Sequence, residues 1–490
     1  MKKRENSIDA LRGLAIFGMV LSGSILHGLP GWMYHAQVGP PDFQFNPNVP
    51  GITWVDLVFP FFLFAMGLAF PFSLGRNLEK GIARRKLVKK VVVRALKLAF
   101  FAIALAHLSP LHYPGHVGWP KWLMALLAFG GFFMAFCRFP RLSHRQTSRL
   151  NTAGYFFVGA LIAFRSLAFD IPFAAHRHDI IILVLANMAV FGAMIWIYTP
   201  RHWLTRLSVL PVFFGLRLTH HVEGSWNAAF WNFRPLQWIG QQWDWLHEQL
   251  LLVGLDTTKT VFYQADFLKY FFIVIPGSIV GDILYRYVRN QQASEYKDLT
   301  AGRRYMAAAV IILALVVLNL TGWYARYQVF TLMVNLGASL GLYLLLKRRE
   351  DSFSKTLYVI ALWSIFWLLL GTVFEAYEGG IKKDPATMSY FFLTSGLAGF
   401  MVIFFKIFYD YFSHTRIIQP LVSIGKNPMV GYVASSFVIM PLFYFLQMRE
   451  FLNTMNEYGQ WFGLLRGLIV TGLMMLLVHI TVRYSYFWKT

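Results

Sequence analysis

Two ionisable side chains near the start of the chain have the types that acid–base and acyl-transfer chemistry needs. His35 lies in GWMYHAQ, and Asp56 follows in GITWVDLVFP, just inside an apolar stretch. A neutral imidazole acts as a general base or a nucleophile near pH 7, and a carboxylate can fix its tautomer. The alternative interpretation is an interfacial histidine that anchors a loop and an aspartate that caps a helix.

Two further groups are candidates for binding a charged ligand. Arg12 follows Asp9 by three residues, so both lie on one face of a helix and can pair. Arg12 is therefore either half of an ion pair at the end of a span or a cation near a phosphate-bearing cosubstrate. Lys426 and Asn427 belong to SIGKNP, which lacks the spacing of a Walker loop. A helix start and a ligand site both remain open for this turn.

Other histidines occur in predicted outer loops without the spacing of a metal site. They are His107, His112, His116, His176, His178, His220 and His221. Imidazole is a frequent metal ligand, but no H-E-x-x-H pattern supports these residues. Cys137 is the only cysteine, which excludes an intrachain disulfide and a cysteine-based metal cluster. We expect no metal.

The elements that must position these residues are membrane spans. The 490 residues are 57% hydrophobic and only 14% charged, whereas soluble domains are about 45–50% apolar and about 25% charged. Apolar runs long enough to cross a bilayer recur along the chain, which predicts an all-α, polytopic transmembrane helix bundle with about 12–14 spans. The expected spans are 9–27, 53–74, 91–109, 120–137, 152–169, 179–198, 267–286, 305–323, 329–346, 356–374, 389–408, 423–446 and 463–482. The stretch 207–218 is a fourteenth span or a re-entrant piece.

Charge asymmetry assigns the two sides of the membrane. The loop 76–97 holds nine basic residues and one acid, and such loops stay cytoplasmic and favour anionic lipid headgroups. The net charge of +22 is gathered in loops of this kind, which argues against a nucleic-acid partner. We expect cytoplasmic N- and C-termini and an uncleaved first span. The chain is read as a single domain, 1–490, with a Trp-rich outer segment at about 219–266.

Pairs of small residues four apart predict helix-packing contacts. They are Gly277 with Gly281, and Gly337 with Gly341.

Several motifs occur in the order of a known family. The segments are Ser7–Gly13 (SIDALRG), His35 in an outer loop, Thr53–Pro60 (TWVDLVFP), Glu378-Gly379 with Lys383 and Ser389-Tyr390, and Gly425–Met429 (GKNPM) followed by Tyr432. Together they resemble the membrane acyltransferase family of heparan-α-glucosaminide N-acetyltransferase and its bacterial relatives. The likeness is weak between about residues 100 and 265, where the family's Pro-Gly-Val-Leu-Gln-Arg segment is missing. A late asparagine of the first span is replaced near 22–24.

The resemblance implies transfer of an acetyl group from cytoplasmic acetyl-CoA, as cosubstrate, to an extracytoplasmic amino sugar or saccharide. It makes His35 the catalytic histidine, either acetylated transiently or acting as a base, with Asp56 as its partner. The expected acetyl-CoA-binding residues are Arg12, Lys426 and Asn427, and the expected acceptor-binding residues are Lys383, Asp384 and Glu378.

Other functions and assemblies stay open. A transporter of a sugar or lipid-linked glycan is the rival, although transporters often carry inverted repeats and none is visible in this sequence. A structural membrane scaffold is a third interpretation, against which the intramembrane Asp56 weighs. The oligomeric state is also undecided, with a homodimer among the alternatives.

Overall fold

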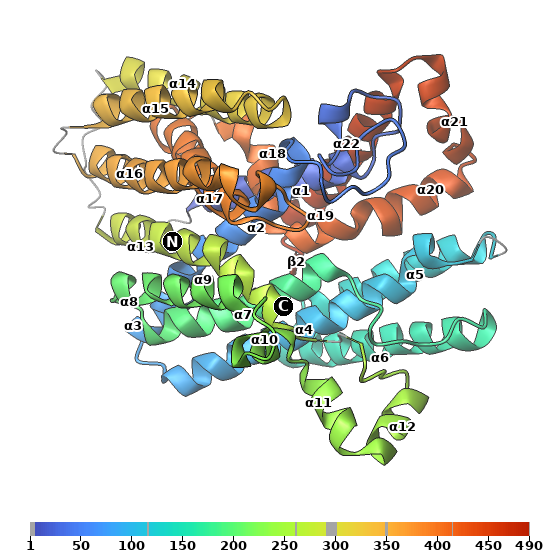
Figure 1. Cartoon of the computed structure of the whole chain (residues 1–490). Helices are drawn as coiled ribbons and strands as arrows, with labels where there is room; N and C mark the ends of the chain where they lie inside the picture. The colour runs from blue at the N-terminus through green and yellow to red at the C-terminus, as the bar shows by residue number, and fades with distance from the viewer. Residues whose placement is uncertain are drawn as a thin grey trace. The chain divides into compact units, whose positions relative to one another are not determined.

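The computed structural model describes residues 5–114, 117–259, 262–290, 301–347, 351–413 and 415–489, and it is built from helices (Figure 1). In this described part the strands are two short ones, β1 (Cys137–Arg138) and β2 (Phe487–Trp488), which pair antiparallel. Among the residues that the structure describes, eleven helices are long and apolar enough to cross a membrane. The all-α transmembrane bundle predicted from the sequence is thereby confirmed.

Each of the thirteen numbered spans expected from the sequence has a helix. The helices are α1 (Asn6–Ser22), α2 (Trp54–Phe70, continued through a π turn and α3 to Glu79), α4 (Arg84–Leu108), α5 (Pro120–Phe136), α6 (His144–Ala168), α7 (Ile180–Tyr198), α13 (Phe271–Asn290), α14 (Gly302–Tyr324), α15 (Gln328–Leu346), α16 (Ser352–Val373), α17 (Met388–Lys406, continued to Tyr411), α19–α20 (Pro428–Phe445) and α22 (Phe462–Arg483). Only α1 and α5, at 17 residues each, are shorter than the other eleven.

The chain divides into two compact units, and both are discontinuous in sequence. Unit 1 comprises Met1–Arg76, Phe272–Gly431 and Asn453–His479. Unit 2 comprises Asn77–Phe271, Tyr432–Leu452 and Ile480–Thr490. Whether the two units act as the single domain expected from the sequence stays a prediction.

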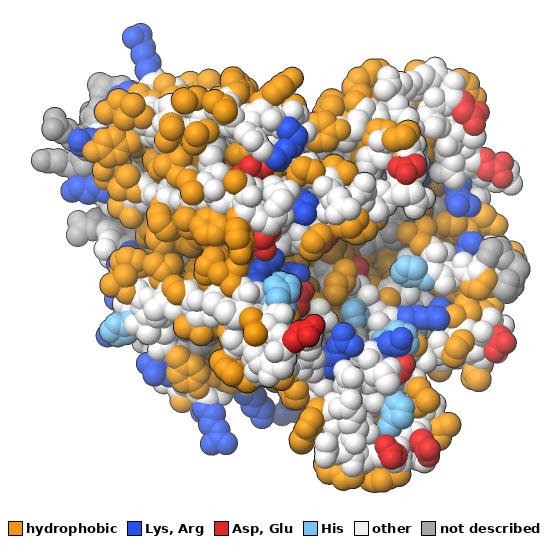
Figure 2. Space-filling view, viewed as in Figure 1, with side chains coloured by type: hydrophobic (Ala, Val, Ile, Leu, Met, Phe, Trp, Pro, Cys, Tyr) orange, Lys and Arg blue, Asp and Glu red, His pale blue; other side chains and the backbone are white. Residues whose placement is uncertain are grey.

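In unit 1, the helices α14, α15 and α16 carry exposed apolar side chains at helical spacing. Examples are Val310, Leu313 and Val317 on α14, Phe330, Met333, Leu336, Leu340 and Leu344 on α15, and Leu362 and Phe366 on α16. Hydrophobic side chains dominate this region in the space-filling view (Figure 2). An apolar stripe exposed on long helices is what a lipid-facing surface requires.

The predicted glycine contacts divide into one pair that packs and one that does not. A Cβ on Gly277 would meet the backbone of Phe64 at 2.5 Å, and one on Gly281 would meet the backbone of Leu68 at 2.6 Å. This pair confirms close packing of α13 on α2. A Cβ on Gly337 has no atom within 4 Å, and one on Gly341 would only touch a side chain at 3.7 Å. The prediction for the second pair is wrong, because α15 exposes that face.

The same contacts fix the direction of α13. Gly277 packs on Phe64, and Gly281, one turn later, packs on Leu68. The helices α13 and α2 therefore run parallel and begin on the same side of the membrane. Four spans (α4 to α7) separate them in sequence, so a fifth crossing is needed for α13 to begin where α2 begins. The helices α8 (Trp203–Leu207) and α9 (Val209–Thr219) are joined by Ser208, which stays helical, and together they rise about 25 Å. The need for an odd number of crossings between α2 and α13 favours a fourteenth span near 207–218.

Two glycines hold α1 against α18 (Thr415–Lys426) in unit 1. A Cβ on Gly13 would lie 1.8 Å from the Leu421 carbonyl oxygen, and one on Gly425 would lie 1.8 Å from the Asp9 carbonyl oxygen. Both obstacles are backbone atoms, which cannot rotate away. The close approach explains why glycine stands in both the SIDALRG and SIGKNP segments.

We expect Gly425→Ala to lower the free energy of unfolding by about 3 kcal/mol or more, because overpacking against backbone forces the two helices apart. The measurement is the thermal midpoint of the purified protein in detergent. Gly472→Ala is the matched control: its Cβ would enter open space on α22, so the midpoint should stay or rise. A Gly425→Ala midpoint equal to that of the control would contradict this packing.

Cysteine labelling tests the prediction that the loop 76–97 lies on the cytoplasmic side of the membrane. Cys137 is buried, and burial raises the pKa of its thiol to about 12, so the native cysteine reacts slowly. In a Cys137→Ala background, Lys80→Cys should resist impermeant thiol reagents in intact cells, whereas Asn48→Cys should react; both positions are exposed. Labelling of Lys80→Cys from outside would overturn the predicted sidedness.

Candidate functional site

The loop that carries His35 is anchored on both sides of the histidine in unit 1. The Tyr34 hydroxyl donates to the Leu26 carbonyl at 2.7 Å and accepts the Leu29 N–H at 3.0 Å. The Thr53 hydroxyl donates to the Tyr34 carbonyl at 2.6 Å, tying the loop to the start of α2. Burial raises the pKa of Tyr34, so its hydroxyl stays protonated as a donor. His35 is thereby held at a fixed place beside α2.

The two ring nitrogens of His35 have different surroundings. The Nδ1 atom accepts the backbone N–H of Gln37 at 3.1 Å. The Nε2 atom lies 3.3 Å from Asp384 Oδ2 and 3.4 Å from Asp56 Oδ1. Because Nδ1 is an acceptor, the neutral ring carries its proton on Nε2, facing the two carboxylates. The side chain is 15% exposed, so a ligand can reach this nitrogen.

Asp56 uses its two oxygens for two purposes. Oδ2 accepts the backbone N–H of Thr53 at 2.8 Å and that of Ala36 at 3.3 Å, which caps α2. Oδ1 faces His35 and lies 3.8 Å from Lys383 Nζ. The side chain is fully buried. Asp56 therefore caps α2 and also lies beside His35, and its part in catalysis stays a prediction.

The loop before α17 brings Asp384 and Lys383 to the histidine. The Gly51 N–H donates to the Ile381 carbonyl at 2.7 Å, which joins this loop to the residues just before α2. The Tyr390 hydroxyl on α17 donates to the Asp56 carbonyl at 2.7 Å. His35 and Asp384 are 349 positions apart in sequence. Of the predicted site residues, His35, Asp56, Lys383 and Asp384 form one cluster.

Glu378 caps the helix that follows its loop. Its Oε2 atom accepts the backbone N–H of Met388 at 2.6 Å, so the side chain caps the start of α17. The nearby Arg326–Glu375 ion pair, at 2.5 Å, fixes the preceding turn. Glu378 supports the loop that carries Lys383 and Asp384, and its predicted contact with the acceptor stays a prediction.

The residues expected to bind acetyl-CoA lie on α1 (Arg12) and at and just after the end of α18 (Lys426 and Asn427). Arg12 Nη1 is 3.4 Å from Asp9 Oδ1, which confirms the i,i+3 pair, and it donates to the Gly425 carbonyl at 3.2 Å. The contact places Arg12 against the turn that contains Lys426 and the fully buried Asn427. Arg12 stands ten residues before the end of α1 at Ser22, about 15 Å along the helix axis. The Arg12 group and the His35 cluster are thus at different depths of unit 1.

A sequence comparison places the chain among known proteins. Residues 4–259, just over half of its length, match the family described as "Domain of unknown function (DUF5009)". The chain belongs to the DUF5009 family. It is also 29% identical over 118 residues to heparan-alpha-glucosaminide N-acetyltransferase of Mus musculus and, over the same length, to that of Homo sapiens. These stretches cover 24% of this chain and only 16% of either curated relative.

The other histidines of this DUF5009 chain differ in their surroundings. His107 is fully buried in unit 2; its Nδ1 lies 2.8 Å from the Ile103 carbonyl, and its Nε2 accepts the Ala174 N–H at 3.2 Å. His112 is exposed, and His116 lies outside the described residues. Among the residues that the structure describes, no group of three or more His, Cys, Asp or Glu could hold a metal ion. His107 is a packing residue and a poor control for activity.

The sequence analysis missed a buried cation. Lys406, near the end of α17, is fully buried and lies 3.0 Å from Glu5 Oε2 and 2.8 Å from Asp410 Oδ2. Its ammonium also sits 4.5 Å from the centre of the Tyr287 ring. A lone lysine inside an apolar span was the available signal, because such charges are costly in a membrane. Here it ties the start of α1 to α17.

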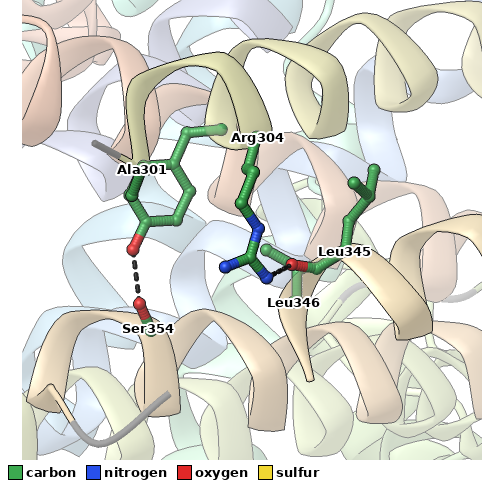
Figure 3. Close-up of a pocket in the computed structure, with 6 residues that line it drawn as sticks. Ala301, Arg304, Leu345, Leu346 and Ser354 are labelled. Carbon is green, nitrogen blue, oxygen red and sulfur yellow. Dashed lines mark hydrogen bonds between the residues drawn. The ribbon is translucent and has the colours of Figure 1, made fainter. Parts of the chain in front are cut away.

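A small hollow lies elsewhere in unit 1, lined by the ends of α14, α15 and α16 (Figure 3). The Tyr305 and Ser354 hydroxyls bond each other there, and Arg304 donates to the Leu345 carbonyl at 2.5 Å. None of the predicted site residues lines this hollow.

Proposed function

We propose that this chain is a membrane-embedded acyltransferase that moves an acetyl group from cytoplasmic acetyl-CoA to an extracytoplasmic amino sugar or saccharide, with His35 as the reacting residue. The observation that carries the proposal is the placement of His35 Nε2 at 3.3–3.4 Å from two carboxylates. The side chain lies beside the start of α2 and is partly exposed. The similarity to an N-acetyltransferase supports the reaction class.

The geometry suits either route for His35. In a two-step route the ring proton moves to Nδ1, the unprotonated Nε2 bonds to the thioester carbonyl carbon, and the C–S bond breaks to release the CoA thiolate, which takes up a proton. The acceptor amine then attacks the acyl-imidazole, and the imidazole leaves. In a direct route the amine attacks the thioester itself, the unprotonated Nε2 of the same tautomer receives the amine proton, and the C–S bond breaks so that the CoA thiolate leaves and is protonated. Both routes use Asp56 to hold the ring.

The Arg12 group suits the cosubstrate. A CoA polyanion would stay near the basic cytoplasmic side, where the loop 76–97 supplies positive charge. Arg12, Lys426 and Asn427 would then hold acetyl-CoA below the histidine, so that only its thioester end reaches His35. Burial along α1 would protect that thioester from water. The protein would act in the bacterial inner membrane, with both termini cytoplasmic.

Turnover by the purified protein tests the proposal. Labelled acetyl-CoA is incubated in detergent with a panel of amino sugars and with the same sugars bearing a hydroxyl in place of the amine. We expect release of CoA and an acetylated sugar with at least one amine. A folded, monodisperse protein that releases no CoA with any acceptor would contradict the enzyme and leave the transporter alternative.

A further inference from the structure

We propose that two short helices of unit 2 rest in the interface of the lipid bilayer, with their exposed aromatic and aliphatic side chains among the headgroups and the first carbons of the acyl chains. The helices are α11 (Pro235–Gln242) and α12 (Asp244–Leu252). With the residues that flank them they form a lobe, defined here as residues 233–253. The inference is independent of the proposed acetyl transfer, because it makes the membrane surface the partner of this lobe.

The lobe is anchored where two spans end. The loop 169–179 joins α6 to α7, and both of these helices are long and apolar enough to cross a membrane. The Ala175 N–H in this loop donates to the Gly254 carbonyl at 2.8 Å, directly after the lobe. A Cβ on Gly254 would overlap the Phe173 carbonyl oxygen, so the approach is close. Three spans, α4 to α6, separate the loop 169–179 from the loop 76–97, which places the lobe on the opposite face of the membrane.

A single buried threonine holds the two helices of the lobe together. Thr257 Oγ1 lies 2.6 Å from His247 Nδ1 on α12, and a Cβ on Gly240 of α11 would overlap the same hydroxyl. The Thr257 side chain is buried. Both helices therefore pack on it with one face and present their other faces outward.

The outward faces of the lobe are aromatic and aliphatic. Trp245 is 64% exposed, and Leu252, two turns later on the same stripe of α12, is 79% exposed. The other exposed apolar side chains of the lobe are Phe233, Trp238, Trp243, Leu251 and Val253. Figure 2 shows hydrophobic side chains along the outer edge of this lobe. A contiguous apolar surface of this kind marks a site of interaction.

The composition of this surface favours a bilayer over a carbohydrate. Tryptophan gathers at membrane interfaces because its ring is apolar and its N–H is polar. A sugar could also stack on the tryptophans, but it would leave Leu251, Leu252 and Val253 in water, whereas acyl chains would cover them. Figure 1 shows α11 and α12 projecting to the side of α6, across the direction of that span. A lobe that extends across a span from its end lies along the membrane surface.

The charge of the lobe indicates how it is held there. Residues 233–253 contain one cation, Arg234, and two acids, Asp244 and Glu248, so their formal net charge is −1. Anionic headgroups do not attract such a segment, in contrast to the nine basic residues of the loop 76–97. Burial of apolar surface is therefore the driving force, and the contact should not depend on salt.

Lipid quenching of a fluorophore on the lobe tests the inference. Full-length protein with Cys137→Ala and Leu252→Cys is labelled with an uncharged fluorophore and placed, one copy per disc, in phosphatidylcholine nanodiscs. Lipids brominated near the glycerol end should quench the label strongly and lipids brominated at the chain ends less, because an interfacial helix lies only about 5–10 Å deep. The quenching should be equal at low and high salt. Trp245→Cys should behave in the same way, and the control Asn48→Cys, an exposed position of the His35 loop, should show little quenching.

The possible results separate the bilayer from other occupants of the lobe. Equal quenching of the labels at Leu252 and Asn48, or quenching that disappears at high salt, would overturn the proposal. Disulfide-linked dimers of Leu252→Cys in vesicles, without lipid quenching, would assign the face to a second copy of the chain. A change of label emission with added saccharide, again without lipid quenching, would assign it to a sugar. Acetyl transfer enters none of these measurements, so a failure here leaves the proposed function untouched.

Discussion

His35→Ala should lower kcat by at least about 10²–10⁴-fold, the usual contribution of general acid–base catalysis. The loss should be larger if the imidazole itself carries the acetyl group, because no other nitrogen in the cluster can replace it. The side chain is partly exposed, and among the described residues its ring nitrogens contact Gln37, Asp384 and Asp56, so the fold and acetyl-CoA binding should persist. The measurement is steady-state acetyl transfer by purified protein.

His112→Ala is the matched control for this variant. His112 is an exposed histidine whose Nδ1 bonds the Ala106 carbonyl, and it belongs to unit 2. It should keep near wild-type kcat. His107→Ala is unsuitable, because a fully buried histidine that bonds two backbone groups contributes to stability. Normal turnover in a well-folded His35→Ala protein would remove the histidine from the mechanism.

Asp56→Asn should lower kcat by at least about 10²-fold with little change in the KM for acetyl-CoA. An amide oxygen can still accept the Thr53 N–H at the start of α2, so the cap and the fold should survive. The amide has no charge to receive or stabilise the Nε2 proton, however, and its NH₂ group would repel that N–H. Loss of the carboxylate behind a catalytic imidazole can cost about 10⁴-fold in related triads.

Thermal melting separates the two roles of Asp56. Asp56→Asn should melt within a few degrees of wild type. Asp56→Leu should melt well below both, because it removes the cap and leaves Lys383 without its buried partner. Full activity in Asp56→Asn would show that this carboxylate serves only the helix start.

The positions of the spans could be predicted from the sequence because a membrane span depends on one strong local feature, a long run of apolar residues. Runs of about 20 apolar residues gave helices at every one of the thirteen numbered positions. The stretch near 207–218 was ambiguous because α8 and α9 are short and polar residues interrupt them. The packing predicted for Gly337 and Gly341 is wrong, because the spacing of small residues does not show whether another helix packs against them.

The site was readable only in part. His35 and Asp56 are 21 positions apart and flank one helix start, so their proximity follows from local structure. Asp384 is 349 positions from His35 in sequence, and only tertiary packing brings it to the same nitrogen. The part of Gln37 in fixing the His35 tautomer could not be predicted, because it contributes a backbone N–H that almost any residue could supply. The capping role of Glu378 could not be predicted from the sequence, because capping and ligand binding use the same carboxylate chemistry.

The central claim is that His35 passes an acetyl group across the membrane. Its most direct test uses proteoliposomes with labelled acetyl-CoA on the side of the loop 76–97 and glucosamine on the side of His35. Wild type should produce labelled N-acetylglucosamine on the glucosamine side, with no transfer of free glucosamine between compartments, and His35→Ala should produce at least about 100-fold less. Equal product from both proteins, or movement of unmodified glucosamine without acetylation, would contradict the account.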